Sequence, residues 1–423
     1  MEEVEVPCYF LCPISLDMMR DPVTIPSGIT YDRDGIERWL FTAGTCPLTK
    51  QPVPAGCDPT PNHTLRRLIQ SWCALHGVER VPTPKPPTDR ARVAALVSRI
   101  AAASRSLVTA AQQEVLDALR ELRDVVAETQ SERSRMLVAA VPGAVDVLAA
   151  VLAASSATKP SSSSESAVTS VADAALEIMS SLQPLSDSEQ CLARVANTEH
   201  QLLVDALVAA LQRPNPASRA RAALLLQNVT DAMPSSRLAS LPEQVFGELV
   251  QLIRDKVSKP ATKAALHVLA GTTAWGRNRV KAVDAGAVAV LVDTLCDGPQ
   301  RRACELALGA LDRLCGCAEG RAALVAHGAG VAAVGTKALR ASEVATDKAV
   351  RVLRSVARHA ATAAVVQEMA QTGVVGTLCV VAQSDQYGDR TRDRARETLR
   401  MHARAWRTSP CLHRDLQAIY PSC

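Results

Sequence analysis

Most of the chain carries apolar residues at helical spacing, and the strongest part of this pattern is a repeat. An Ala followed by Leu or Val recurs every 42 residues, at Ala223, Ala265, Ala307 and Ala349. Further apolar residues stand three or four positions after each of these alanines, on the same face of a helix. Three equal steps indicate structural repeats, each a unit of two or three helices that stacks on its neighbours.

Weaker copies of the repeat begin at Ala118, Ala175 and Ala395. Their spacing departs from the regular period where insertions are visible, namely a serine-rich stretch at about residues 155–166 and a polar stretch before Ala395. Serine clusters of this kind interrupt helices, so the first insertion is expected to be a loop. The pattern as a whole predicts an all-α array of stacked repeats over residues 89–407, and the resemblance of these repeats to armadillo repeats implies a right-handed solenoid.

The start of the chain shows a different pattern. A short β-favouring run follows Pro22 and stops at the turn around Gly28, so a hairpin is predicted. Asp32 stands where a helix N-cap is expected, and Ile36 and Leu40 follow at i, i+4 spacing, so that both point into a core. A second helix is predicted from an apolar stripe of four residues: Leu65, Leu68, Ile69 and Trp72. These elements make a small α+β module.

A proline-rich segment, residues 79–88, separates the two regions. Each proline fixes its own φ and biases the preceding residue away from helix, so the segment is expected to be a stiff linker. The predicted organisation is an α+β domain at residues 5–78, the linker, helical repeats at residues 89–407 and a C-terminal tail at residues 408–423. The pattern offers no interpretation of the tail.

Charge and composition exclude several classes of protein. The 423 residues include 47 Lys and Arg against 43 Asp and Glu, a net charge of +4. This is not the concentrated basic field of a nucleic-acid binder. The chain has no apolar run of the ~18 residues needed for a membrane span, and its acidic start lacks the features of a signal peptide. Its 13 scattered cysteines suit a reducing compartment. We therefore expect a cytoplasmic protein, with the nucleus as a further location.

Five motifs of the N-terminal module point to a known family. They read CPISLDMMRDPV, SGITYDR, IERWL, TCPLTKQP and PNHTLRRLI. The module resembles the U-box, the zinc-free relative of the RING finger, from end to end. A RING finger needs two full sets of Cys and His ligands, whereas this module has no CxxC pair, so no metal and no other cofactor is expected. Hydrogen bonds among groups such as Asp32, Thr49 and Asn62 would stabilise the loops instead, and the cysteines are interpreted as small buried apolar residues.

The resemblance implies a docking groove for a ubiquitin-conjugating enzyme that carries ubiquitin. Carried over from the family, four residues would make the apolar contacts: Ile14, Leu16, Trp39 and Pro47. Lys50 stands where the family places a polar or basic residue that contacts both the enzyme and its ubiquitin. Such a ligase holds the thioester in a reactive geometry and uses no nucleophile of its own. Ordinary core packing of Ile14, Leu16 and Trp39 is the other interpretation.

The helical repeats resemble armadillo repeats, which stack into an array with a groove for a peptide or protein. An unidentified protein substrate would bind there. Four residues are candidates for lining this groove: Asn228, Asp312, Arg354 and Arg400. The positions one and two repeats after Asn228 hold Ala270 and Asp312, so the Trp and Asn ladder of armadillo proteins that carry basic import signals is absent. The arginine-rich C-terminal repeats suit either an acidic segment of a partner or a solvated helix face.

Together the two regions resemble the plant U-box ubiquitin ligases with armadillo repeats, the class with a U-box near the N-terminus. This implies an E3 ubiquitin ligase that binds the conjugating enzyme through the U-box and its substrate through the repeats. It also implies a role in plant defence or stress signalling and self-association into homo-oligomers. Two alternatives stay open. One is a non-catalytic armadillo adaptor with an inactive U-box, and the other is a nuclear transport receptor, which the missing ladder opposes.

Overall fold

The computed structural model of the chain describes most of its residues. They are residues 6–54, 57–76, 90–104, 109–127, 135, 138–139, 141–157, 165–182, 200–407, 409–418 and 420. The predicted linker and the centre of the serine-rich stretch, residues 158–164, lie outside the described residues. The chain divides into two compact units, Met1–Arg99 with Glu121–Pro142 and Ile100–Arg120 with Gly143–Cys423.

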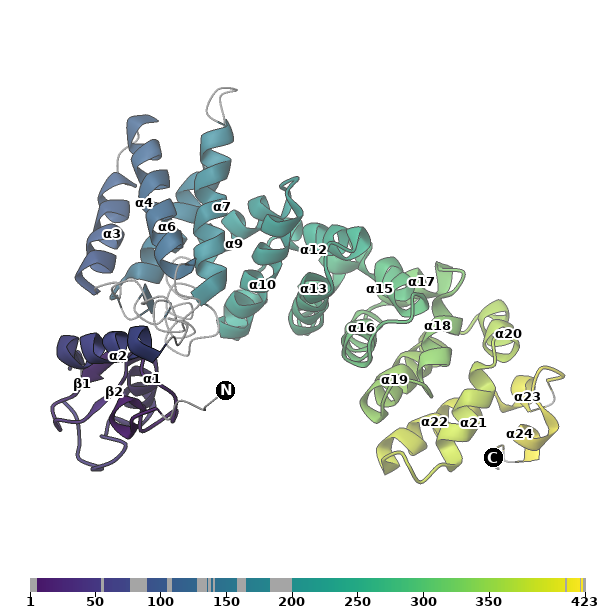
Figure 1. Cartoon of the computed structure of the whole chain (residues 1–423). Coiled ribbons are helices and arrows are strands. Elements are labelled where there is room, and N and C mark those ends of the chain that lie inside the picture. Colours follow the sequence, from purple (N-terminus) through teal and green to yellow (C-terminus); the bar gives the residue numbers. More distant parts are fainter. Residues whose placement is uncertain are drawn as a thin grey trace. The chain divides into compact units, whose positions relative to one another are not determined.

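The N-terminal module is built on an antiparallel sheet with strand order β2-β1-β3 (Figure 1). Its elements in chain order are the 3-10 helix η1 (Cys8–Phe10), β1 (Pro22–Thr24), β2 (Thr30–Asp32), α1 (Arg33–Ala43), β3 (Thr60–Pro61) and α2 (His63–His76). Val23 pairs with Tyr31 across β1 and β2. Gly28 turns the chain between them with a φ of +79°, which glycine adopts without strain. The predicted hairpin is confirmed.

The core of the module joins the sheet to both helices. Its buried residues are Phe10, Cys12, Met19, Val23, Ile25, Tyr31, Ile36, Cys46, Ile69 and Cys73. Leu40 is partly buried and packs against this core. Leu68, predicted in the stripe of α2, is 54% exposed, so that part of the prediction was wrong. The covered stripe of α2 runs through Leu65, Ile69, Trp72 and Cys73 and leaves Leu68 exposed.

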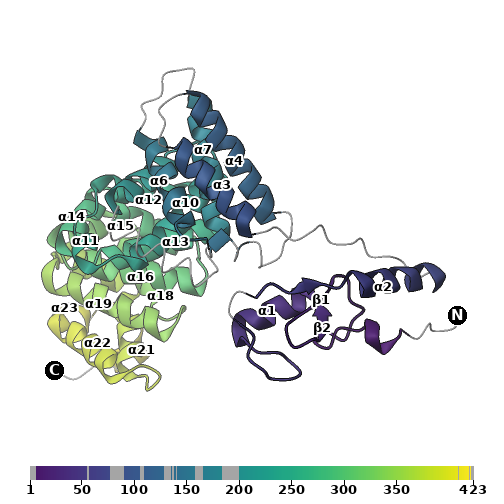
Figure 2. The ribbon, with the colours of Figure 1, turned by 90° about the vertical axis from the view of Figure 1, so that its left-hand side faces the viewer.

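The second region consists of helices, and from α6 onward neighbouring helices pack against one another in a stack (Figure 1; Figure 2). They are α3 (Arg90–Ala103), α4 (Thr109–Ala127), α6 (Ala144–Ala157), α7 (Glu165–Leu182), α9 (His200–Leu211), α10 (Pro216–Ala232), α11 (Ser235–Leu238), α12 (Glu243–Asp255), α13 (Lys259–Thr272), α14 (Gly276–Asp284), α15 (Ala287–Cys296), α16 (Arg301–Leu314), α17 (Ala318–Ala326), α18 (Gly330–Lys337), α19 (Glu343–His359), α20 (Ala363–Gln371), α21 (Val374–Gln383), α22 (Asp389–Met401), α23 (Ala403–Trp406) and α24 (Arg414–Ala418). The prediction of helical repeats is confirmed.

The 42-residue period marks equivalent helices of this stack. Ala223, Ala265, Ala307 and Ala349 lie in α10, α13, α16 and α19, and all four are completely buried. These helices pack against one another in that order, and α22, which carries Ala395, packs against α19. A small side chain at each contact allows neighbouring helices to approach closely. We call the row formed by α10, α13, α16, α19 and α22 the helix ladder.

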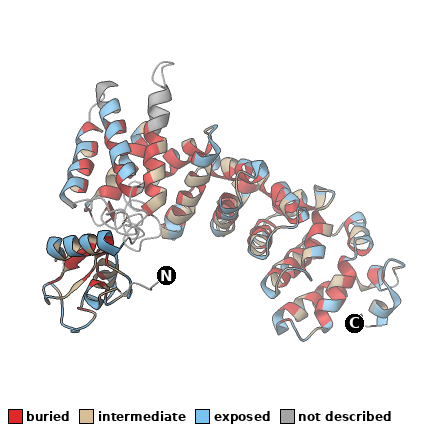
Figure 3. Cartoon of the chain, viewed as in Figure 1, coloured by how far each residue is buried: buried red, intermediate tan, exposed pale blue. Residues whose placement is uncertain are grey.

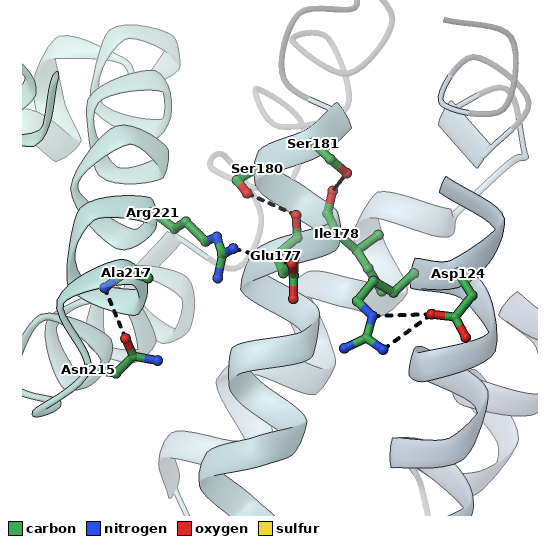
Figure 4. A network of polar contacts seen from close by, with 9 residues as sticks. Asp124, Glu177, Ile178, Ser180, Ser181, Asn215, Ala217 and Arg221 are labelled. Atoms are coloured by element: carbon green, nitrogen blue, oxygen red, sulfur yellow. Dashed lines mark hydrogen bonds and ion pairs between the residues drawn. The ribbon is translucent and has the colours of Figure 1, made fainter. Parts of the chain in front are cut away.

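Polar contacts join neighbouring helices at the surface of the stack. Arg221 of α10 reaches Glu177 of α7, with 3.2 Å between Nη2 and Oε1, and Asn215 caps α10 by accepting a hydrogen bond from the Ala217 amide (Figure 4). Buried residues lie where helices face one another, and exposed residues lie on the outside (Figure 3). Because exposed ion pairs contribute about 0–1 kcal/mol each, the apolar faces supply most of the stability of the stack.

Trp406 of α23, together with α24 and Tyr420 of the C-terminal tail, covers the end of the stack. Trp406 is 1% exposed, and its indole Nε1 donates to the Val366 carbonyl at 2.8 Å. The buried Tyr420 donates its hydroxyl to the Leu399 carbonyl, and α24 packs against α21. A terminal repeat has no neighbour on one side, so its apolar face needs a cap of this kind.

Of the described helices, only α20 and α21 taken together are long and apolar enough for a membrane span. Among the described helices none reaches the required length and apolar character alone, whereas α20 and α21 reach it as a pair with a 69° bend between them.

Candidate functional site

Two loops of the N-terminal module have the same backbone conformation. The first covers residues 12–16 and the second residues 46–50. In each, the amide of the last residue donates to the carbonyl of the cysteine that begins the loop, at 2.8 Å for Leu16 and 2.9 Å for Lys50. Both of these last residues have a left-handed φ, 61° and 58°, which is uncommon outside glycine. The two loops are copies of one turn.

The sequence carries a signal for this relation that sequence reasoning missed. The first loop reads Cys-Pro-Ile-Ser-Leu and the second Cys-Pro-Leu-Thr-Lys, so the first four positions match in residue type. The fourth residue plays the same part in both, because Ser15 Oγ accepts from the Asp17 amide and Thr49 Oγ1 accepts from the Gln51 amide, each at 3.4 Å. The loops are therefore stabilised by the same local hydrogen bonds.

A cysteine sulfur lies at the base of the second loop and gathers three hydrogen bonds. Cys46 Sγ lies 3.3 Å from Ser27 Oγ, 3.2 Å from Tyr31 Oη and 3.4 Å from the Thr49 amide. Burial alone would raise the pKa of the Cys46 thiol, but the hydrogen bonds from Ser27, Thr49 and Tyr31 lower it to about 6. Burial also raises the pKa of the Tyr31 phenol.

The interpretation of the module's cysteines as small buried apolar residues needs correction. Cys12, Cys46 and Cys73 are buried, but Cys8 is exposed and Cys57 is partly exposed. Cys12 Sγ also accepts a hydrogen bond, from the backbone amide of Asp32 at 3.2 Å. Two of the sulfurs are thus acceptors that fix the loops. Within the described part of the chain, no group of three or more His, Cys, Asp or Glu side chains is placed to hold a metal ion.

Asp32 fixes the end of the first loop. It stands at the N-cap position of α1 as predicted, but its side chain makes no capping hydrogen bond there. Its Oδ1 accepts instead from the amides of Arg20 and Asp21, at 3.1 and 2.8 Å. The prediction of a side-chain cap was wrong because two loop amides bind the same oxygen. Burial raises the pKa of the Asp32 carboxyl.

Asn62 joins the hairpin to α2. Its Oδ1 accepts from the Leu65 amide at 3.0 Å, which caps the first turn of α2. Its Nδ2 donates to Thr30 Oγ1 at 3.3 Å. One side chain therefore links the sheet with the closing helix.

Two variants of Asn62 should separate the contribution of the helix cap from that of the hydrogen bond to Thr30. Asn62→Ala removes the cap and the link to Thr30, so we expect a loss of about 1–2 kcal/mol in the stability of the module. Asn62→Asp keeps the oxygen that caps α2 and should lose less. The measurement is hydrogen exchange of the full chain, read at residues 22–32 and 63–76. Equal protection in the Ala variant and the parent would contradict the assignment.

A cavity of about 420 Å³ lies between the first loop and α1. Ile14 from the loop and Trp39 from the helix both line it, so the structure brings two of the predicted contact residues together. Leu16, Pro47 and Lys50 are not part of its lining.

Trp39 is fixed by contacts with the second loop. Its indole Nε1 donates to the Thr45 carbonyl at 2.9 Å. Lys50 Nζ lies 5.2 Å from the centre of its ring, within the range of a cation–π contact. Trp39 therefore connects α1, and the cavity that it lines, to the loop that carries Lys50.

Each loop exposes a leucine. Leu16 is 73% exposed and Leu48 is 58% exposed, whereas Pro47 is partly buried. Ordinary core packing is therefore wrong for Leu16, while Ile14 and Trp39 do pack partly against the core. Sequence reasoning missed Leu48, although the match between the loops places it at the position of Ile14. The loops therefore expose apolar side chains, whereas the cavity that Ile14 and Trp39 line also carries charged residues, among them Asp17 and Arg38.

The predicted groove residues of the repeats share one position on the helix ladder. They are Asn228 in α10, Asp312 in α16, Arg354 in α19 and Arg400 in α22. Asn228 is partly buried and Arg400 is exposed. Asp312 is ion-paired with Arg351 at 2.9 Å, and Arg354 makes two hydrogen bonds to Glu397, at 2.8 and 2.9 Å. Two of the four candidates thus belong to ion pairs between repeats.

Both regions match known protein families. A family described as "U-box domain" matches residues 6–77, and a family described as "Plant U-box protein ARM repeat region" matches residues 92–421. The two matches together cover the module with the paired loops and the helix ladder.

Two proteins of Arabidopsis thaliana are similar to the chain over its length. One is named E3 ubiquitin-protein ligase PUB23, with 42% identity over 99% of this chain and 98% of that protein. The other is named E3 ubiquitin-protein ligase PUB22, with 40% identity over 100% of each. A solved structure concerned with the interaction between cadherin and beta-catenin aligns at a TM-score of 0.53, with 14% identity, over 80% of this chain and 59% of that chain. At that identity the likeness shows the fold alone.

Proposed function

We propose that this chain, which belongs to the plant U-box proteins with an armadillo-repeat region, acts as an E3 ubiquitin-protein ligase. The similar Arabidopsis proteins carry this activity in their names. The proposal assigns a task to each region. The U-box binds a conjugating enzyme charged with ubiquitin, and the helix ladder binds a protein substrate.

One observation carries the assignment of the U-box. Its two matching loops expose Leu16 and Leu48, and the cavity beside them is lined by Ile14 and Trp39. An exposed apolar surface next to a fixed aromatic side chain is typical of a protein interface. Lys50 lies at the edge of this surface, over the Trp39 ring, where we place its contact with both the enzyme and its ubiquitin.

The U-box contributes position and no covalent step. Cys46 is the thiol of this region with a pKa lowered to about 6, but it is 0% exposed and its sulfur is held by three hydrogen bonds. A sulfur in that place cannot reach a thioester on a partner. Holding the charged enzyme in one orientation raises the effective concentration of the reacting groups, which is the catalytic contribution we assign to the U-box.

The biological setting of the proposal follows from the resemblance of the chain. We place the substrate among regulators of plant defence or stress signalling, in the cytoplasm with the nucleus as a further location. The buried apolar faces of the ladder helices leave their polar faces for this partner, and these faces carry Asn228, Asp312, Arg354 and Arg400.

Chain formation should not require zinc. An assay with activating enzyme, a panel of conjugating enzymes, ubiquitin, Mg²⁺ and ATP should yield chains on the full-length protein. A zinc-selective chelator should leave the rate unchanged, because hydrogen bonds to sulfur fix the loops. A zinc-dependent RING ligase, treated in parallel, should lose activity and serves as the control.

Two results would contradict this account. Loss of activity in chelator alone would show that the cysteines bind a metal. No chains with any conjugating enzyme would favour the adaptor with an inactive U-box.

A further inference from the structure

A second cavity, of about 340 Å³, lies on the helix ladder where α16, α19 and α22 contribute side chains. Arginines dominate its lining: Arg351, Arg354 and Arg358 come from α19, and Arg394 comes from α22. Asp312 of α16 is also part of the lining. We call this cavity the arginine pocket. It includes two of the residues that the sequence suggested for the substrate groove.

Carboxylates of neighbouring repeats hold three of these arginines in place. The pairs are Arg351 Nε with Asp312 Oδ1 at 2.9 Å, Arg354 Nε with Glu397 Oε2 at 2.8 Å and Arg394 Nη1 with Asp347 Oδ1 at 2.6 Å. Each pair joins two adjacent helices of the ladder. The guanidinium groups are therefore oriented before any ligand arrives, which lowers the entropy cost of binding.

Positive charge remains in excess after these pairs are counted. Four arginines, with Lys348 close by, face three carboxylates: Asp312, Asp347 and Glu397. Arg358 is the most accessible of the four, with a side chain that is 53% exposed and an Nη1 that lies 3.6 Å from Glu397. Arg351 uses Nε for its pair and is 43% exposed. Both can donate further hydrogen bonds into the pocket.

We propose that the arginine pocket binds a phosphorylated serine or threonine in a protein substrate. This rests on the proposed function, because it names the chemistry of the segment that the repeats bind. Planar guanidinium forks match phosphate oxygens in a bidentate arrangement. An unmodified acidic side chain brings one charge and competes with carboxylates that already occupy the arginines. A phosphate brings about −1.5 to −2 charges and three acceptor oxygens, so it suits the remaining positive charge better.

The test uses the purified full-length chain and three fluorescein-labelled peptide libraries. The libraries are degenerate nonapeptides that differ only at the central residue, which is phosphoserine, serine or glutamate. Anisotropy titrations should show binding of the phosphoserine library at least about ten-fold tighter than binding of the other two, as expected for added charge-assisted hydrogen bonds.

Substitutions of Arg358 locate the binding. Arg358→Gln should weaken binding of the phosphoserine library about ten-fold, and Arg358→Lys should give an intermediate loss because lysine keeps the charge without the fork. The three pairs that hold the other arginines do not involve Arg358, so the fold should persist. Arg390→Gln is the matched control, since Arg390 is exposed on α22 and outside the pocket lining.

Three outcomes would overturn the proposal. They are equal binding of the phosphoserine and serine libraries, equal binding of the glutamate library, and an equal loss in Arg358→Gln and Arg390→Gln. Failure of the ligase function is read separately. Arg358→Gln should form ubiquitin chains on itself at the rate of the parent, and Trp39→Ala should bind the phosphoserine library normally. If the protein bound phosphoserine through Arg358 but never formed ubiquitin chains, the ligase function would be refuted and the proposal for the arginine pocket would stand.

Discussion

Trp39→Ala should lower ubiquitin chain formation by the full-length protein on the order of 100-fold. Truncation of an aromatic anchor at an interface typically costs about 2 kcal/mol or more, and a cost of about 2.7 kcal/mol corresponds to 100-fold in affinity. The substitution removes the indole from the cavity that Ile14 also lines, together with its hydrogen bond to Thr45 and its contact with Lys50. Ile14→Ala should act in the same direction with a smaller loss. The measurement is the initial rate of chain formation at concentrations of the conjugating enzyme below saturation.

A matched set of leucines separates docking from folding. Leu16 is 73% exposed and Leu68 is 54% exposed, so truncating either should leave the core intact. Leu16→Ala should slow chain formation because Leu16 belongs to the proposed docking surface. Leu68→Ala, on α2, should not. The docking surface would be refuted by normal rates in both Trp39→Ala and Ile14→Ala, or by equal losses in the two leucine variants.

The repeat could be predicted from the sequence because the same residue type returns at a fixed period. A completely buried helix contact demands a small residue at one position, and the chain meets that demand at Ala223, Ala265, Ala307 and Ala349. The same reasoning predicted the hairpin, since Pro22 and Gly28 restrict the backbone by themselves. Features of this kind need no knowledge of distant residues.

Predictions failed where distant groups compete for one side chain. Asp32 was expected to cap α1, but the amides of Arg20 and Asp21 bind its carboxylate. Leu68 was expected in the core, but the covered stripe of α2 runs through Ile69 and Cys73 and leaves Leu68 exposed. The C-terminal end gave no periodic signal, because Trp406 of α23 and Tyr420 of the tail act one by one as caps of the last repeat.

The site residues also divide into those that the sequence indicated and those that it could not reveal. The motifs singled out Ile14 and Trp39, and the structure brings both to one cavity. Leu48 was missed because its exposure follows from the conformation of the second loop and not from its own residue type. On the ladder, the partners of Arg354 and Asp312 lie about one repeat away in the chain, so a solvated arginine face and a pocket could not be told apart before the helices were placed.

Asp21→Ala should destabilise the U-box by about 3 kcal/mol, because it leaves a buried guanidinium without its main partner. Arg33 Nε lies 2.6 Å from Asp21 Oδ2, and the two side chains are 8% and 13% exposed. Arg66 of α2 also approaches Asp21, at 3.9 Å. Glu37 stays near Arg33, at 3.4 Å, and limits the loss. Hydrogen exchange of the full chain should show reduced protection at residues 22–43, while the helix ladder stays protected.

A second substitution tests whether the stranded charge is the cause. In the double variant Asp21→Ala with Arg33→Met, the buried guanidinium is gone, so part of the lost protection should return, although Glu37 loses its contact with Arg33. If the double variant were less stable than Asp21→Ala alone, the packing of the Arg33 side chain would matter more than its charge, and the argument would fail. Chain formation should follow the fraction of folded U-box through both variants. Asp21 lies outside the two loops and does not line the cavity with Ile14 and Trp39, so it is not part of the proposed docking surface. We therefore expect any loss of activity on substitution of Asp21 to act through folding, in contrast to the loss expected for Trp39→Ala.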